Sequence, residues 1–208
     1  AAYFSQRPSQ TRNTVNRSAK KLAKMSGYRL VILTVADDAL EQGILDFIEV
    51  YNKSWKRPEP FPEFIPELCR RAAKAGLLRL GLIHVEGQPV AAQLWLVHRC
   101  KAHIVKLAYD QAFDKASAGS VLTAALMSHV IDTDLVTEVD YLIGDDPYKR
   151  HWMDQRRERW GLVAFNPMSV SGFSRAARHA VGRVVSRLRE AWRRRVARSS
   201  SARVAKAW

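Results

Sequence analysis

Three consecutive β-strands are predicted between residues 77 and 109, and they form the centre of the fold. Residues 77–85 and 89–98 are mostly apolar, and only the turn-forming Glu86–Gln88 separates them. A second short link at residues 99–102 leads into a third strand at residues 103–109. Because links this short join antiparallel strands, the pattern predicts an antiparallel β-meander.

Helices and further strands are predicted around this centre. The β-branched run Tyr28–Ala36 predicts a buried strand, and Asp37 and Asp38 supply an N-cap for the helix that follows. Helical periodicity and turn residues place the other elements. Beside the meander, we predict helices at 7–25, 39–55, 66–75, 119–132 and 147–160, and strands at 28–36, 139–143 and 162–166. Helices flanking a mixed, mostly antiparallel sheet indicate the α+β class.

The C-terminal segment differs from the rest of the chain in charge. Residues 173–208 contain ten Arg, one Lys and one Glu, a net charge of +10, so the remaining residues carry only +4 of the total of +14. From Phe173 onward, apolar residues recur at helical spacing and arginines fill the opposite face, which predicts a basic amphipathic helix. Such a helix can lie on an anionic membrane, pack on the domain or a partner, or bind nucleic acid loosely. We favour the membrane or a membrane-bound partner over nucleic acid.

The chain length favours one domain with an appendage. We expect the main domain at residues 1–168 and a tail at residues 169–208, with disorder from Arg198 to Trp208.

The cysteines and the hydropathy exclude several classes of protein. Cys69 and Cys100 lie far apart without Cys-x-x-Cys or His-rich spacing, which argues against a structural zinc site or a disulfide framework. No apolar run approaches the roughly 20 residues that span a bilayer, and the N-terminus lacks a signal-peptide pattern. We expect a cytoplasmic protein, peripheral at the inner membrane through its tail.

A candidate anion site lies at the start of the helix predicted at 119–132. Ser117, Gly119 and Ser120 can point backbone N–H groups toward an anion, and the helix dipole adds to the attraction. This arrangement suits a pyrophosphate. Serine and glycine at a helix start also serve as simple caps.

Two further segments carry polar or aromatic residues where predicted elements end. The segment Asp140–Lys149 places Asp145 and Tyr148 after an apolar strand, where they can act chemically or serve as an N-cap and a surface ring. The proline-rich segment Ser54–Pro62 contains Trp55, which can line a substrate site or seal the core.

An ordered series of motifs runs through most of residues 3–168. The motifs are Arg7-Pro8-Ser9-x-x-Arg12-Asn13-Thr14, Ser54-Trp55-Lys56, Leu80-Gly81, Gly87-x-Pro89-x-Ala91-Ala92-Gln93, Lys106-Leu107-Ala108-Tyr109-Asp110, Ser117-x-Gly119-x-x-Leu122 and Asp140-x-x-x-Gly144-Asp145-x-x-Tyr148-Lys149. In this order they resemble a branch of the GNAT acyltransferases, the acetyltransferase-like proteins of cellulose and exopolysaccharide clusters, which is related to the FemAB-type peptidoglycan-bridge transferases. Members usually extend further at the N-terminus, so we expect this chain to be the C-terminal half of a longer protein.

The resemblance implies where an acyl donor binds. The strand His103–Tyr109 would pair with the pantetheine arm of acetyl-CoA, and the loop Ala116–Leu122 would hold its pyrophosphate, with no metal involved. The cofactor-binding residues expected on this basis are Leu107, Lys115, Ser117, Gly119, Ser120, Val121 and Lys149. The loop departs from the superfamily pattern Gln/Arg-x-x-Gly-x-Gly/Ala, because Lys115, Ser117 and Gly119 stand where more glycine is usual and Ala118 replaces a proline common in this branch.

Direct acyl transfer requires a base for the acceptor and an acid for the departing thiolate. Asp110, at the end of the central strand, is our candidate base, and the same position also suits a loop cap. The resemblance implies a tyrosine acid near the start of the helix after the fifth strand, and Tyr148 matches that location. We assign Trp55, Lys56, Gln93 and Asp145 to the acceptor site.

The expected function is transfer of an acetyl or other acyl group from acyl-CoA to an amine or hydroxyl of a bacterial polysaccharide or cell-envelope precursor. One alternative is a FemAB-like transferase that uses aminoacyl-tRNA. The other is a non-catalytic accessory module that binds a membrane, a synthase or nucleic acid through its tail.

Overall fold

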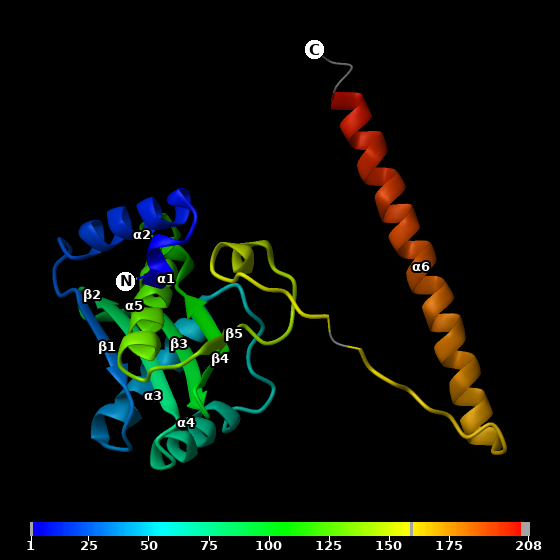
Figure 1. Ribbon diagram of the computed structural model, residues 1–208, viewed down its shortest axis with the longest axis horizontal. Coiled ribbons are helices and arrows are strands. Elements are labelled where there is room, and N and C mark those ends of the chain that lie inside the picture. Colours follow the sequence, from blue (N-terminus) through cyan, green and yellow to red (C-terminus); the bar gives the residue numbers. More distant parts are fainter. Residues whose placement is uncertain (1, 159, 205–208) are drawn as a thin grey trace. The chain divides into compact units, whose positions relative to one another are not determined.

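The computed structural model describes residues 2–158 and 160–204, and the chain forms two compact units, Ala1–Gln155 and Arg156–Trp208 (Figure 1). The first unit is built on a five-stranded sheet in the order β1-β2-β3-β4-β5. The strands are β1 (Arg29–Leu33), β2 (Leu78–Val85), β3 (Gln88–His98), β4 (Lys101–Tyr109) and β5 (Glu138–Asp140). Strands β1 to β4 pair antiparallel, and β5 pairs with β4 in parallel. The predicted fold class and the central meander are confirmed.

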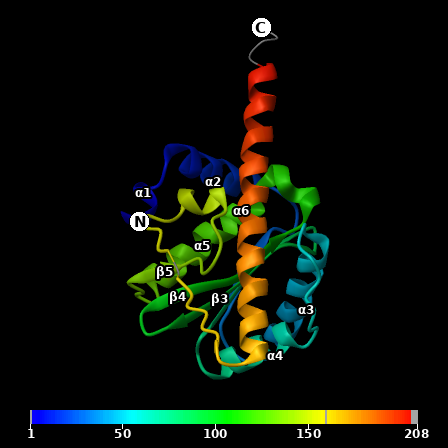
Figure 2. The same ribbon diagram turned by 90° about the vertical axis from the view of Figure 1, so that its right-hand side faces the viewer.

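Helices cover both faces of this sheet, and each face has its own hydrophobic core (Figure 2). One face is covered by α2 (Ser9–Leu22) and α5 (Ala118–Asp132), with the short α1 (Ala2–Ser5) preceding them. The other face is covered by α3 (Asp38–Lys53) and α4 (Phe64–Lys74). Two short 3₁₀ helices, η1 (Gln111–Ala116) and η2 (Pro147–His151), follow β4 and β5 in the chain.

Local chemistry explains where α3 begins and why α5 lies close to the sheet. The carboxylate of Asp37 accepts the N–H of Leu40 at 3.0 Å, which is the predicted N-cap. A Cβ atom at Gly81 in β2 would stand 2.8 Å from Cδ1 of Leu126 in α5. Glycine at position 81 therefore allows α5 to pack directly on the strands.

The region after β5 is less regular than predicted. Among the described residues of the helix predicted at 147–160, which exclude residue 159, only Pro147–His151 are helical, as η2, and the strand predicted at 162–166 is irregular. Both predictions were wrong. The carbonyl of Trp152 accepts hydrogen bonds from the Tyr3 hydroxyl and the Arg7 guanidinium, and Arg7 also pairs with Asp154. These long-range contacts replace the hydrogen bonds that would have continued the helix.

The second unit contains the helix α6 (Val170–Val204). Large apolar side chains of its described part are exposed, including Val181, Leu188 and Trp192. Residues 198–204 are helical where disorder was expected, and residues 205–208 lie outside the described part of the chain. Within residues 2–158 and 160–204, no helix combines the length and the apolarity needed to cross a bilayer.

Candidate active site

The sheet opens between its last two strands. β5 pairs with β4 only from Lys101 to His103, where Asp140 lies opposite His103. The carboxylate of Asp140 then accepts the N–H of Leu142 at 2.7 Å, and Leu142 adopts a left-handed backbone with φ 57°. This turn directs the chain away from β4. In the described part of the chain, no strand therefore pairs with the outer edge of β4 from residue 104 to 109, and alternate backbone N–H and C=O groups there remain available to a ligand.

A β-bulge lies in the same stretch of β4. The register with β3 passes from Leu94↔Lys106 to Trp95↔Ile104, which leaves Val105 as the extra residue. As a result, the adjacent residues Val105 and Lys106 both face α3, Val105 in the core and Lys106 beside Tyr51. Bulges re-aim side chains and backbone groups, and they are common beside active sites.

The start of α5 has the geometry of an anion site. Ser117 adopts a left-handed conformation with φ 50°, and its side chain does not cap the helix. Its carbonyl accepts the N–H groups of Ser120 at 3.0 Å and Val121 at 3.2 Å. The N–H groups of Ala118 and Gly119 precede these and have no acceptor within the helix, so they and the helix dipole favour an anion here.

Two contacts hold this helix start in place. A Cβ atom at Gly119 would stand 3.1 Å from Cδ1 of Tyr109, so glycine allows the end of β4 to approach α5. The amide of Gln93 donates to the Gly119 carbonyl at 3.0 Å and to Thr123 Oγ1 at 2.8 Å, and accepts from Trp95 Nε1 at 2.9 Å. Gln93 is only 1% exposed. Gln93, which was predicted to bind the acceptor substrate, thus anchors α5.

An aromatic wall joins α3 to β4 beside the free edge. The ring of Trp55, which is half-exposed, packs on the ring of Tyr109 with centroids 4.8 Å apart. Lys56 Nζ lies 5.7 Å from the Trp55 ring centroid and 5.9 Å from that of Tyr51. Three residues predicted for the site from distant segments, Trp55, Lys56 and Gly119, are therefore linked. Tyr109 contacts both Trp55 and Gly119, and Trp55 contacts Lys56.

Lysines on this side of the sheet have shifted pKa values. Burial, followed by the charges of Lys106 and Lys149, lowers the pKa of Lys56, although Asp146 opposes them. Burial also acts to lower the pKa of Lys106, but its hydrogen bond to Glu59, at 2.6 Å, and the nearby Tyr51 and Glu59 outweigh burial and raise it.

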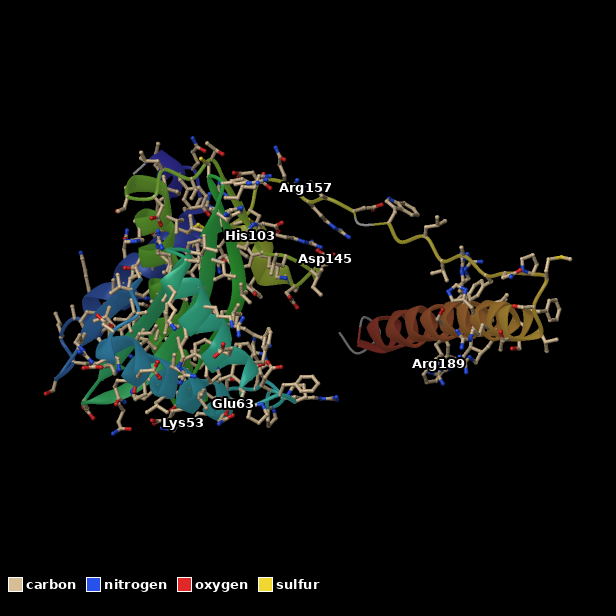
Figure 3. The ribbon with its side chains drawn as sticks, turned by 90° about the horizontal axis from the view of Figure 1, so that it is seen from below. Lys53, Glu63, His103, Asp145, Arg157 and Arg189 are labelled. Carbon is tan, nitrogen blue, oxygen red and sulfur yellow. The ribbon has the colours of Figure 1, made fainter. Side chains whose placement is uncertain are left out.

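Lys149 holds the segment that follows β5. Its ammonium donates to the carbonyl of Ile143 at 2.6 Å and lies 3.3 Å from the carboxylate of Asp146. Lys149, predicted to bind the donor, thus organises its own loop. Asp145 is exposed on this loop, 3.6 Å from Arg150, and its side chain points outward in Figure 3.

The two candidate catalytic residues lie on different elements, and no described contact joins them. Asp110 accepts the N–H of Ala112 at 2.9 Å and so caps η1. Tyr148, on η2, is 41% exposed and meets Tyr141 edge to face with centroids 5.9 Å apart. Burial and the charge of Asp146 raise the pKa of Tyr148 to about 12, which keeps the phenol protonated.

The other residues predicted to bind the acyl donor lie on different sides of the start of α5. Leu107 packs against the core on the α5 side, and Lys115 is exposed on η1. Ser120 lies in the first turn of α5 and is partly buried. Val121 is buried and lines a hollow of about 690 Å³ between α2 and α5, away from Lys56.

Four residues of this region were not among the predicted site residues: Tyr51, Glu59, Lys106 and Tyr109. For Lys106 a signal existed, because a lysine interrupts an otherwise apolar strand that was expected to bind the donor. Tyr51 has the helical spacing of a core residue, and Glu59 lies in a loop without a pattern.

Comparisons with known proteins show the family of the chain and agree with its fold. A family model described as "Acetyltransferase (GNAT) domain" matches residues 9–150. Curated proteins gave no match. Among solved structures, AAC(6')-Iy in complex with a bisubstrate analog superposes with a TM-score of 0.51 and 8% identity, over 68% of this chain and 99% of that one.

Two other solved structures are similar at a lower level. The glucosamine-6-phosphate N-acetyltransferase from Arabidopsis thaliana has a TM-score of 0.48 and 14% identity, over 66% of this chain and 99% of that one. A GNAT family acetyltransferase from Staphylococcus aureus has a TM-score of 0.49 and 9% identity, over 66% and 98%.

Proposed function

The chain belongs to the acetyltransferase (GNAT) domain family and is an acyltransferase of that type, and on this premise we propose that it transfers an acetyl group from acetyl-CoA to an amine or hydroxyl of a polysaccharide or cell-envelope precursor. The observation that carries the proposal is the free outer edge of β4, which lies beside the bulge at Val105 and leads to the helix start at Ala118 and Gly119.

These residues fit the two ends of the donor. The amides of a pantetheine arm can pair with an unpaired strand edge, and the free edge of β4 at residues 104–109 offers such groups. A pyrophosphate fits the N–H groups of Ala118 and Gly119, because they lie at the positive end of α5 and lack acceptors within the helix. The hydroxyls of Ser117 and Ser120 lie in the same turn and can add hydrogen bonds.

The reaction requires positioning and two proton transfers. The acceptor nitrogen or oxygen forms a bond to the thioester carbon as the carbon–sulfur bond breaks, and we propose that backbone N–H groups at the β4 bulge stabilise the carbonyl oxygen. We assign Asp110 as the base that takes the acceptor proton and Tyr148 as the acid that returns a proton to sulfur. The raised pKa of Tyr148 keeps this acid protonated at neutral pH.

The acceptor class rests on the motif series. The motifs from Arg7 to Lys149 resemble those of the cellulose and exopolysaccharide branch, and the exposed ring of Trp55 provides a flat surface of the kind on which sugar rings pack.

Calorimetric titration with acetyl-CoA tests the proposal. We expect saturable binding by the wild-type chain, loss of binding in Gly119→Asp, and retention within a few-fold in Gly119→Ala, which adds one carbon but no charge. Circular dichroism of each variant checks folding. If the folded wild-type chain does not bind acetyl-CoA, or if Gly119→Asp binds it as well as Gly119→Ala does, the proposed donor site is wrong.

We also propose that α6 holds the enzyme on an anionic membrane surface. Leu188 and Trp192 are 64% and 67% exposed on the apolar side of α6, while arginines occupy the other side. We expect co-sedimentation with phosphatidylglycerol vesicles but not phosphatidylcholine vesicles. Leu188→Glu should abolish it, whereas Ser186→Glu on the polar side should only weaken it. Equal effects of the two variants, or preferential capture by a DNA oligonucleotide, would exclude the membrane assignment.

A further inference from the structure

Lys56 is a half-buried cation that forms no ion pair with a carboxylate in the described part of the chain. In the described part of the chain its ammonium contacts only the rings of Trp55 and Tyr51, at 5.7 and 5.9 Å from their centroids. Neighbouring lysines differ in this respect, since Lys106 pairs with Glu59 at 2.6 Å and Lys149 with Asp146 at 3.3 Å. Partly buried cations are normally paired, so the exception requires a reason.

Two neighbouring lysines add positive charge around Lys56. The ammonium of Lys106 lies 5.4 Å from the same Tyr51 ring centroid that Lys56 approaches, so the two cations share one ring. The charge of Lys149 adds to this repulsion, whereas the charge of Asp146 opposes it. Because Glu59 and Asp146 are each engaged with another lysine, this compensation is only partial, and an incoming anion at Lys56 would relieve the remaining repulsion.

The backbone holds Lys56 in place at the end of α3. The hydroxyl of Ser54 is buried, donates to the carbonyl of Tyr51 at 2.7 Å and accepts the N–H of Lys56 at 3.3 Å. These two bonds define the turn by which the chain leaves α3, so that Lys56 begins the loop at a fixed position. A prearranged cation loses little conformational entropy when it binds a ligand.

The position of this cation separates it from the donor's pyrophosphate site. Contacts lead from Gly119 to Tyr109, from Tyr109 to Trp55, and from Trp55 to Lys56, so two aromatic rings intervene between Lys56 and the start of α5. Lys106, the neighbour of Lys56, lies on the bulged part of β4 whose edge is free. An anion at Lys56 would therefore lie beside the reacting end of the donor.

From these observations we propose that Lys56 anchors an anion subsite for the acceptor, which carries a carboxylate or phosphate group in addition to its reacting amine or hydroxyl. This inference rests on the proposed function and narrows its acceptor to acidic or phosphorylated molecules. Trp55 borders the subsite and contacts the body of the acceptor, while Lys106 and Lys149 strengthen the local positive potential.

Titration with inorganic phosphate tests the subsite directly. Lysine side-chain NMR signals of the full chain are followed as phosphate is added in the presence of saturating CoA, which occupies the donor site. The Lys56 signal is assigned by its loss in Lys56→Gln. We expect saturable shifts at Lys56 and phosphate binding about tenfold or more weaker in Lys56→Gln. The matched control Lys53→Gln removes an exposed lysine three residues earlier and should leave phosphate binding unchanged.

The outcomes separate this subsite from the proposed donor site. If phosphate does not shift Lys56, or if Lys53→Gln and Lys56→Gln weaken binding equally, there is no subsite. If CoA displaces phosphate from Lys56, or if Lys56→Gln weakens acetyl-CoA binding about tenfold as well, the anion belongs to the donor and the acceptor assignment is overturned. Failure of the wild-type chain to bind acetyl-CoA is measured separately and concerns the proposed function alone.

Discussion

The ring of Trp55, just beyond α3, packs on the ring of Tyr109, at the end of β4, with centroids 4.8 Å apart and planes inclined by 50°. Tyr109 in turn lies against Gly119 at the start of α5. One aromatic pair thus connects three segments that are distant in sequence, at the place where the donor and acceptor sites are proposed to meet.

Replacement of Trp55 by alanine should weaken donor binding without unfolding the protein. Without the indole, Tyr109 loses the partner that holds it against Gly119. An aromatic pair contributes about 0.5–1.5 kcal/mol, so the calorimetric affinity for acetyl-CoA should fall about two- to tenfold. Phe61→Ala, which removes a 71% exposed ring from the same loop, should have no effect. Equal affinities of Trp55→Ala and wild type would show that the pair does not support the donor site.

Gln93→Leu should destabilise the fold. The leucine leaves the Trp95 indole N–H without its acceptor in the core, which costs about 1–3 kcal/mol in the free energy of unfolding. Urea denaturation measures the change. Gln111→Leu makes the same substitution at an exposed position of η1 and should stay within about 0.5 kcal/mol of wild type. A neutral Gln93→Leu would mean that the buried amide network contributes no net stability.

Asp110→Asn separates the two roles of Asp110. Asparagine can still accept the N–H of Ala112, so the cap on η1 and the melting temperature should be preserved. If the carboxylate is the base, kcat falls about 100-fold or more with unchanged acetyl-CoA affinity. Asp110→Ala, which also removes the cap, should lose both activity and stability. Full activity of Asp110→Asn would show that Asp110 caps η1 and is not the base.

Tyr148→Phe should lower kcat about 100-fold while acetyl-CoA binding persists. The pKa of Tyr148 is raised to about 12, so its acid form is fully populated at pH 7 and is depleted only as the pH approaches 12. The wild-type kcat should therefore show no decline from this group between pH 7 and 9. Tyr28→Phe, next to β1 at the opposite edge of the sheet, is the control. A kcat unaffected by Tyr148→Phe would remove Tyr148 from the chemistry.

The two cysteines should react with a thiol reagent at very different rates. Cys69 is fully buried, and burial raises its pKa to about 12, whereas Cys100 is exposed. Because the thiolate is the reactive form, a colorimetric thiol assay at pH 8 should count one fast thiol in the native protein and two in urea. Cys100→Ser should abolish the fast reaction, and two fast thiols in the native state would contradict the packing of α4 on the sheet.

Much of the fold could be predicted from sequence because its signals are local. The strands of the meander, the cap at Asp37 and the helix start after Ser117 each depend on a few neighbouring residues. The helix predicted beyond His151 failed for the opposite reason, because Tyr3 and Arg7 bind the carbonyl of Trp152 from the other end of the domain.

The site was harder to predict for the same reason. The pair Glu59–Lys106 joins residues 47 positions apart, and no periodicity in the sequence indicates this contact. The bulge at Val105 and the left-handed turn at Leu142, which together open the sheet, occur at residues that are ordinary for a strand. Gln93 was assigned to the acceptor site, whereas its amide satisfies buried polar groups of α5 and of Trp95.

The free edge of β4 also affects solubility. A row of unpaired N–H and C=O groups can template pairing with a strand from another molecule, and natural proteins guard such edges with charge, especially lysine. Lys106 stands within this row and carries its charge beside the bulge, where a foreign strand would have to desolvate it. The residue that helps to shape the acceptor side of the site thus also acts as a gatekeeper against edge-to-edge aggregation whenever the donor is absent.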